Sequence, residues 1–297
     1  MPQKTKTIVL HHSADLDGKL SARLCLRKYP GAYLQGINYG FKNFNWHDID
    51  EHTRVVMVDF CLEPWSMMVH MQEKAKEFIW IDHHKTSIAE DEKHVVAGHK
   101  KIKGIRQVGL AGCELTWNYF FPTELIPTAV QLLGRYDVWD FTDSRVQPFQ
   151  MGMRTISHEP TSDIWEKLLG PESIAEDTVI NIVRDGEIIV RYKKLQDTLY
   201  VKMLSFLTLI SPKGMDCSYR VIACNAAMNN SQLFDSIWDG NKYDIMASFH
   251  RRNDQQWSVS LYTKHDHIDC SAIAATFGGG GHQKAAGFVV EKLPFQH

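Results

Sequence analysis

The sequence predicts an α/β protein with two domains: an N-terminal domain on a mostly parallel sheet and a smaller C-terminal α/β domain, joined by a helical linker. In the first half, short apolar runs alternate with helical patterns, which is typical of βαβ units. Residues 160–205 lack strand alternation, and β character returns from Tyr219 onward. We therefore expect domains at 1–160 and 206–297 with a linker at 161–205, which suits 297 residues.

The first domain is expected to alternate buried strands with helices. Pro30-Gly31 ends the first helix, and Pro64 stands in the first turn of the second, where proline is tolerated. The predicted strands cover residues 7–10, 33–37, 55–58 and 78–81, and the predicted helices cover 18–28, 64–76, 110–120 and 126–133.

The linker carries an apolar stripe with helical spacing. Its members recur at intervals of four and three residues, which places them on one face of a helix: Ile188, Tyr192, Leu195, Leu199 and Met203. We expect this face to pack on the core, and a helix that links two domains is compatible with it. In the second domain we expect strands at 219–224, 243–250, 257–263 and 288–290 and helices at 231–238 and 271–277.

Composition and charge exclude several classes of protein. Lys and Arg number 33 against 35 Asp and Glu, a net charge of −2, which disfavours a domain that coats long nucleic acid by charge. There is no apolar stretch of 18 residues and no signal-peptide core, so we expect neither a membrane span nor secretion. The six cysteines form no CxxC pair, which is typical of reduced thiols in a cytoplasmic protein.

Acidic and histidine residues follow three of the predicted strands. The run HHSADLDG follows residues 7–10, Asp59 follows 55–58, and Asp82-His83-His84 follows 78–81. Ligands bind outside the carboxyl ends of parallel strands. A single aspartate there, such as Asp15, is more often a helix N-cap or turn former. Three such sites together indicate a metal centre.

The residue types narrow the choice of metal. Imidazole and carboxylate without a nearby thiolate suit Mn²⁺ or a similar divalent transition ion, whereas all-oxygen sites favour Mg²⁺ or Ca²⁺. If their segment is a loop, the alternate carboxylates of Asp15 and Asp17 can reach two different ions. Paired ions usually share a carboxylate and clamp phosphoryl substrates.

Five motifs in order resemble the DHH phosphoesterase superfamily with its associated C-terminal domain (DHHA1). They read HHSADLDGKLSA, VVMVDF, WIDHHKT, GRYDVWDF and FGGGGHQKAAGF and cover about residues 7–290. Asp-His-His alone is a weak match, but the order of all five is specific. Within the superfamily the chain is most similar to small bacterial two-domain oligoribonucleases (nanoRNases), which are relatives of the RecJ-like exonucleases.

The resemblance implies a ligand set for two divalent ions, with Mn²⁺ as the expected metal. Asp59 would bridge both ions. The other implied ligands are His11 and Asp15 for the first ion, and Asp17, His83 and Asp137 for the second. His12, which is out of register with the family motif, is the alternative to His11. Asp140 and Asp143 are local rivals of Asp137.

The resemblance also implies catalytic and substrate-binding residues. Asp82 would orient an imidazole or another ligand, and His84 would face the substrate phosphate and serve catalysis. Gly280, Gly281 and His282 would grip the far end of a nucleotide, since glycines let a backbone approach a phosphate closely; a flexible turn is the alternative.

Tyr262 departs from the family pattern. It stands where many relatives carry an arginine that contacts the terminal phosphate, which puts that contact in doubt. Tyr262 could stack on a base instead, as aromatic residues do in single-strand binders. An ordinary aromatic residue of the strand is the alternative.

The resemblance and the ligand set together predict a metal-dependent phosphodiesterase or exonuclease that hydrolyses short single-stranded oligonucleotides to mononucleotides with a metal-activated water. The alternatives are a cyclic or linear dinucleotide phosphodiesterase, a 3′-phosphoadenosine-5′-phosphate (pAp) phosphatase, and a nucleotide-binding regulator that does not cleave. The expected partner is an oligonucleotide or dinucleotide substrate. Whether two copies form a homodimer stays open.

Overall fold

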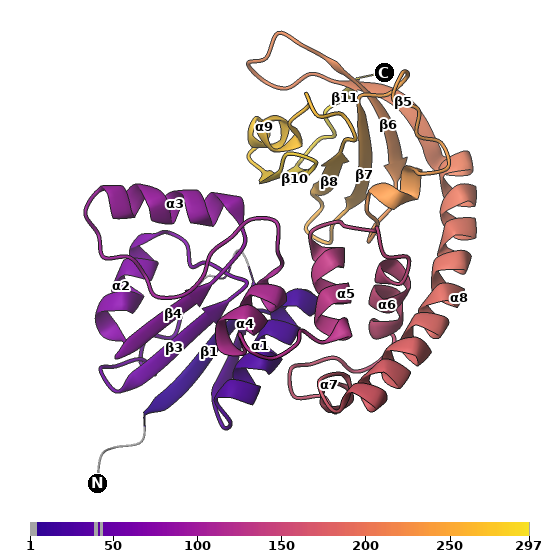
Figure 1. Cartoon of the computed structure of the whole chain (residues 1–297). Helices are drawn as coiled ribbons and strands as arrows, with labels where there is room; N and C mark the ends of the chain where they lie inside the picture. Colours follow the sequence, from indigo (N-terminus) through magenta and orange to yellow (C-terminus); the bar gives the residue numbers. More distant parts are fainter. Residues whose placement is uncertain (1–4, 39–40, 42–43, 297) are drawn as a thin grey trace. The chain divides into compact units, whose positions relative to one another are not determined.

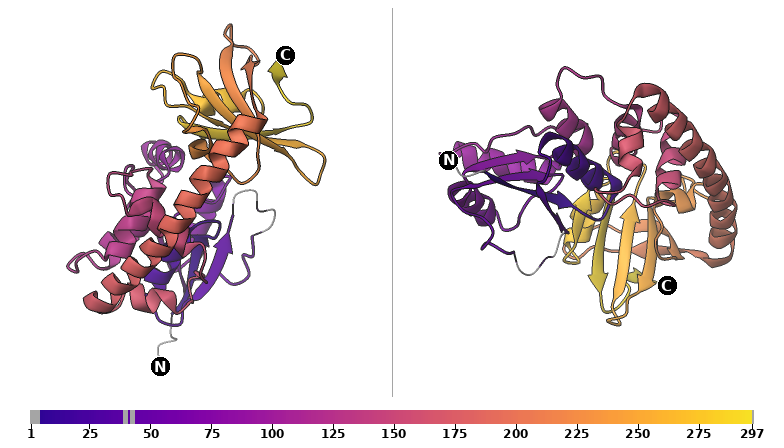
Figure 2. Two further views of the ribbon diagram at one scale, coloured as in Figure 1. Left: turned by 90° about the vertical axis from the view of Figure 1, so that its right-hand side faces the viewer. Right: turned by 90° about the horizontal axis from the view of Figure 1, so that it is seen from below.

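The computed structural model describes residues 5–38, 41 and 44–296. The chain divides into two compact units, Met1–Val190 and Arg191–His297. The division falls inside α8 (Glu172–Leu204), a continuous helix of 33 residues (Figures 1 and 2). This helix lies wholly within the segment 161–205, where the sequence predicts a helical linker.

The first unit contains a parallel sheet with the strand order β2-β1-β3-β4. Its strands are β1 (Lys6–His12), β2 (Tyr33–Ile37), β3 (Thr53–Val58) and β4 (Glu77–Ile81). His11 pairs with Val58, and Val58 pairs with Ile81, so the carboxyl ends of β1, β3 and β4 are level. The residues that follow these strands therefore meet at one edge of the sheet.

Helices cover both faces of this sheet (Figure 1). Val9, Val56 and Ile79 belong to the cluster that includes α1, α4 and α5, whereas the next residue of each strand belongs to a cluster with α2. Burial on both faces explains the continuous apolar strands, as in other parallel sheets. The helices of this unit before α8 are α1 (Leu16–Lys28), α2 (Ser66–Lys74), α3 (Lys85–Val96), α4 (Gly112–Phe120), α5 (Thr128–Asp137), α6 (Val146–Met153) and α7 (Ile164–Leu168).

The second unit contains a mixed sheet with the order β11-β5-β6-β7-β8-β10-β9. β6 and β7 are parallel, and the other neighbouring pairs are antiparallel. The predicted α/β class is therefore confirmed for both halves of the chain. The elements are β5 (Ser205–Ile210), β6 (Tyr219–Asn225), a 3-10 turn (Ser231–Phe234), β7 (Ile245–Arg251), β8 (Trp257–Tyr262), α9 (Cys270–Ala275), β9 (Gly280–His282), β10 (Ala285–Val290) and β11 (Phe295–Gln296).

The apolar stripe of the linker does not pack on the core, and that expectation is wrong. Its five members are between 56% and 79% exposed. The buried side of α8 is a second apolar stripe, which includes Val179 and Ile182 in the first unit and Val201 in the second. Periodicity identifies both faces of such a helix but does not show which one is covered.

Two further expectations concern thiols and membranes. The six cysteines are free; five are buried, and Cys217 is exposed. In the part of the chain that the structure describes, no helix combines the length and the apolar character that crossing a membrane requires.

Candidate metal centre

The carboxyl edge of the parallel sheet gathers the acidic and histidine residues that follow its strands. His12 ends β1, Asp59 follows β3, and Asp82 to His84 follow β4. Asp59 has a φ of 54°, which is uncommon for a residue other than glycine. Its N–H donates to the carbonyl oxygen of Ile81 at 2.9 Å, which holds the strained backbone in place.

Two helices, α1 and α5, bring further carboxylates to this edge. Asp15 is the N-cap of α1, and its Oδ1 accepts a hydrogen bond from the N–H of Gly18 at 3.0 Å. Asp17 lies in the first turn of α1, and Asp137 is the last residue of α5. Gly18 permits this arrangement, because a Cβ there would lie 2.1 Å from the carbonyl oxygen of His12.

The first group of ligand atoms comes from His12, Asp15 and Asp59, and these atoms lie within 4.8 Å of one another. His12 Nδ1 is 3.1 Å from Asp15 Oδ2 and 3.8 Å from Asp59 Oδ2. Burial lowers the pKa of His12, but hydrogen bonds to Asp15 and Asp59 outweigh it and raise the pKa to about 10. The two carboxylates thus create a site that favours positive charge.

The structure places His12, and not His11, in this group, although the family register implies His11 as the ligand. His11 is only 4% exposed, and its Nδ1 lies 2.9 Å from the carbonyl oxygen of His12. Successive side chains of a strand point to opposite sides, so one histidine of the doublet reaches the carboxylates and the other does not. Burial lowers the pKa of His11.

The second group comes from Asp17, His83 and Asp137. His83 Nε2 lies 3.3 Å from Asp137 Oδ2 and 3.8 Å from Asp17 Oδ2. The rivals of Asp137 are engaged locally: Asp140 accepts hydrogen bonds from Thr142, and Asp143 pairs with Arg145.

Asp59 lies between the two groups. Its Oδ2 faces His12 at 3.8 Å, and its Oδ1 faces His83 Nε2 at 3.2 Å. One oxygen toward each group is the arrangement that a bridging carboxylate needs.

The protein alone stabilises the ionised forms of the buried Asp59 and Asp137 carboxylates poorly. Burial and the neighbouring Asp17 carboxylate raise the pKa values of Asp59 and Asp137 well above their usual range. The buried Oδ1 of Asp59 accepts no hydrogen bond, and an unsatisfied buried oxygen is costly. Both features fit a site for cations, and the mixed imidazole and carboxylate set fits divalent transition ions.

Asp82 and His84 form a hydrogen-bonded pair beside these groups. Asp82 is fully buried; its Oδ1 is 2.7 Å from His84 Nδ1 and accepts the N–H of His83 at 2.8 Å. Burial lowers the pKa of His84, but the bond to Asp82 outweighs it and raises the pKa. His84 also forms a third possible ligand group with Asp59 and His83. The geometry thus allows His84 to hold an ion as well as to face a substrate.

Sequence reasoning missed Gly112, at the start of α4. The N–H groups of Gly112 and Cys113 donate to the two oxygens of Asp17 at 2.8 and 2.7 Å. A Cβ on Gly112 would lie 2.7 Å from the Cβ of Asp59, so a larger residue would displace a ligand. The positive end of a helix stabilises the Asp17 carboxylate here. No local signal connects Gly112 with a residue 95 positions away.

The glycine motif forms β9 and the turn that leads into β10. Gly280, Gly281 and His282 are exposed and pair with β10. Gly281 has a φ of 142°, and a Cβ there would lie 2.7 Å from the carbonyl oxygen of Ala285, so the hairpin itself requires this glycine. No such steric demand applies to Gly280. The roles of these residues toward a nucleotide stay predictions.

Tyr262 lies at the end of β8 and is partly buried against the core cluster that contains Cys224 and Met246. Its hydroxyl donates to the carbonyl oxygen of Asn229 at 3.1 Å, and burial raises the pKa of the phenol. These contacts favour the alternative of an ordinary strand aromatic over a base-stacking residue.

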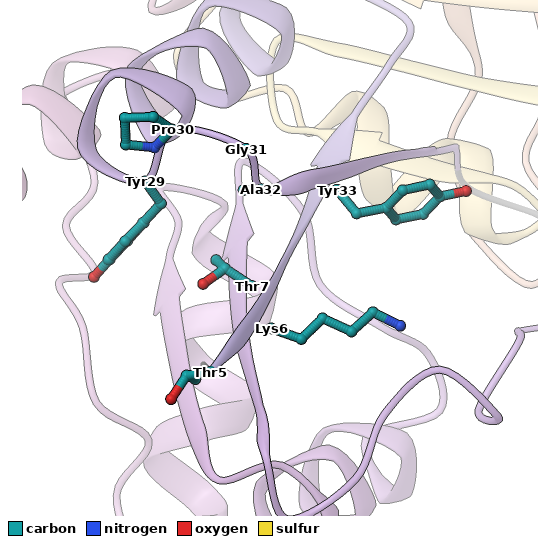
Figure 3. A pocket seen from close by; sticks show the side chains of 8 residues that line it. All are labelled: Thr5, Lys6, Thr7, Tyr29, Pro30, Gly31, Ala32 and Tyr33. Carbon is teal, nitrogen blue, oxygen red and sulfur yellow. The ribbon is translucent and has the colours of Figure 1, made fainter. Parts of the chain in front are cut away.

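A hollow of about 400 Å³ lies at the opposite edge of the parallel sheet (Figure 3). It is formed by the amino ends of β1 and β2 and by the turn at Pro30-Gly31. None of the ligand groups described above contributes to its lining.

Comparisons with known proteins identify the fold. No family model matches the chain. It is 26% identical over 275 residues, 86% of its length, to an uncharacterized protein, R106, of Acanthamoeba polyphaga mimivirus, and it spans 59% of that protein. A solved DHH domain from a member of the s1p family of ribosomal proteins superposes with a TM-score of 0.59 at 14% identity, covering 97% of this chain and 83% of that one. A manganese-bound RecJ exonuclease gives 0.47 at 13% identity, with coverages of 96% and 86%.

The molecule is thus a two-unit α/β protein with an acid–histidine centre at the carboxyl edge of a parallel sheet. Its fold is that of DHH-domain proteins, and the resemblance that the sequence motifs indicate is confirmed at the level of the fold.

Proposed function

We propose that the chain is a metal-dependent phosphodiesterase that hydrolyses short oligonucleotides. It would hold two divalent ions, with Mn²⁺ as the preferred metal. The ligands would be His12 and Asp15 for one ion, and Asp17, His83 and Asp137 for the other, with Asp59 shared. The position of Asp59 carries the proposal, because each of its oxygens faces one ligand group.

The chemistry follows from this arrangement. Paired divalent ions supply a nucleophilic water at neutral pH and offset the charge of the phosphate. Asp82 fixes the orientation of the His84 ring through the 2.7 Å contact with Nδ1. Because the pKa of His84 is raised, the ring stays protonated to higher pH and can give a proton to the leaving oxygen.

The substrate class we propose is short single-stranded oligonucleotides, degraded to mononucleotides. The sequence resemblance to nanoRNases supports this choice, and the exposed Gly280, Gly281 and His282 are the residues we assign to the far nucleotide. A dinucleotide phosphodiesterase, a pAp phosphatase and a regulator that binds nucleotides without cleavage are the alternatives that an assay must separate.

We expect hydrolysis with Mn²⁺ to be much faster than with Ca²⁺ and to be lost in EDTA, because imidazole ligands suit Mn²⁺ better than Ca²⁺. The assay uses oligonucleotides from the dinucleotide upward, together with cyclic dinucleotides and pAp. The substrate that is turned over fastest selects among the enzymatic alternatives. Binding without turnover of any of them would favour the regulator, and full activity in EDTA would contradict the two-ion centre.

A further inference from the structure

The end of α5 places a tryptophan where glycine is the usual residue. The N–H of Trp139 donates to the carbonyl oxygen of Tyr136 at 3.1 Å, and the N–H of Asp140 donates to that of Arg135 at 2.8 Å. This pair of bonds is the Schellman motif, whose first residue beyond the cap adopts a left-handed conformation. Trp139 has a φ of 62°, which a bulky side chain seldom adopts. Backbone preference alone would therefore select against tryptophan here.

Packing does not explain the tryptophan fully either. The side chain is 47% exposed. The indole meets Phe141 edge-on, with ring centroids 4.9 Å apart, and meets Tyr136 at 5.8 Å. These two contacts hold the ring while much of it stays open to solvent. A ring that is held before binding loses little conformational freedom when a flat ligand packs on it.

The position of Trp139 in the chain brings its backbone close to the metal centre. Asp137 belongs to the second ligand group, and Trp139 follows it by two residues. Two peptide links place the two Cα atoms at most about 7.6 Å apart. Both residues lie in the first unit, so their proximity does not depend on the second unit.

We propose that Trp139 stacks on a nucleobase next to the phosphate that is cleaved. Every base offers a flat face, so an indole binds bases with little sequence preference, as in general single-strand binders. Trp139 thereby takes the role that the sequence suggested for Tyr262, whose hydroxyl is bonded within the protein and whose ring is partly buried. This inference rests on the proposed function, because it names how that centre recognises its substrate.

The test combines a variant with a modified substrate. Trp139→Asn removes the ring, and asparagine tolerates the left-handed conformation. With Mn²⁺ and the full chain, we expect kcat/KM for a dinucleotide to fall about 10-fold, within the range measured for loss of base stacking. For the native protein, kcat/KM should be lower by a similar factor with an abasic dinucleotide than with the normal one. For Trp139→Asn, the abasic substrate should lower kcat/KM little further. Trp139→Phe should restore most of the loss. Additive losses, or no loss at all, would overturn the inference.

A second measurement separates this inference from the proposed function. Calorimetric binding of AMP should weaken about 10-fold in Trp139→Asn, and binding of ribose 5-phosphate by a much smaller factor. If the native protein cleaves no substrate but this difference is present, the hydrolytic function fails and stacking stands. Cleavage without this difference would reject stacking alone. Gln255→Gly is the matched control for a substitution at a residue with left-handed backbone. Gln255 is exposed, has a φ of 66°, and lies in the turn between β7 and β8.

Discussion

Asp59→Asn is expected to lower turnover at least about a hundredfold while the protein stays folded, the scale of losing a directly acting group. The reason is that one buried carboxylate faces both ligand groups, so its loss weakens both sites together. Turnover with Mn²⁺, together with circular dichroism, measures this. Asp143→Asn is the control, because Asp143 pairs with Arg145 outside the ligand groups and should keep near-native turnover.

The same substitution should not destabilise the metal-free protein. The raised pKa of Asp59 means that folding favours its neutral form, so its ionised form opposes folding at neutral pH. Removing that charge should keep or raise the thermal midpoint in EDTA at pH 7. This advantage should shrink as the pH falls toward the unfolded-state pKa of about 3.9 and disappear below it, where the carboxyl is neutral in both states. Native turnover, or a midpoint several degrees lower in a variant of normal fold, would remove Asp59 from the proposed role.

His83→Ala is expected to abolish cleavage of both a dinucleotide and a generic ester such as bis-p-nitrophenyl phosphate. His83 Nε2 lies within 3.8 Å of carboxylate oxygens of Asp17, Asp59 and Asp137. Removing the imidazole therefore alters the proposed metal centre itself, which both substrates need. Retention of activity on either substrate would contradict this role.

His282→Ala provides the contrast, because we assign His282 to the far nucleotide. It should impair cleavage of a dinucleotide about 10-fold, about 1.4 kcal/mol, and the generic ester much less, since that ester has no distant nucleotide to hold. Equal damage to both substrates would place the glycine motif in the chemical step or in folding instead of recognition.

Local sequence signals predicted the parallel sheet and its acidic edge well. Strands such as Val55 to Val58 are apolar on both faces, and parallel strands carry the residues that follow them to one edge, so Asp59 and His83 could be predicted to meet. The choice between His11 and His12 could not be made in this way. It depends on which side of the strand faces the start of α1, which carries both Asp15 and Asp17.

Contacts between distant segments, and the choice of buried face in a helix with two apolar faces, could not be predicted from the sequence. The hydrogen bond from Gly112 to Asp17 joins two segments that only the folded core brings together. The helix α8 has two apolar faces, and the pattern alone favoured the stripe with Tyr192 and Leu195, which the structure exposes. The strand β5 was missed because its apolar run follows this helix with no intervening turn residues.

The most direct test of the two-ion centre is anomalous diffraction from crystals soaked in Mn²⁺. We predict two peaks at the carboxyl edge of the parallel sheet, both in contact with Asp59. One should lie against His12 and Asp15, and the other against Asp17, His83 and Asp137. A single peak, a peak held by His11 in place of His12, or ions bound away from Asp59 would contradict the proposed centre.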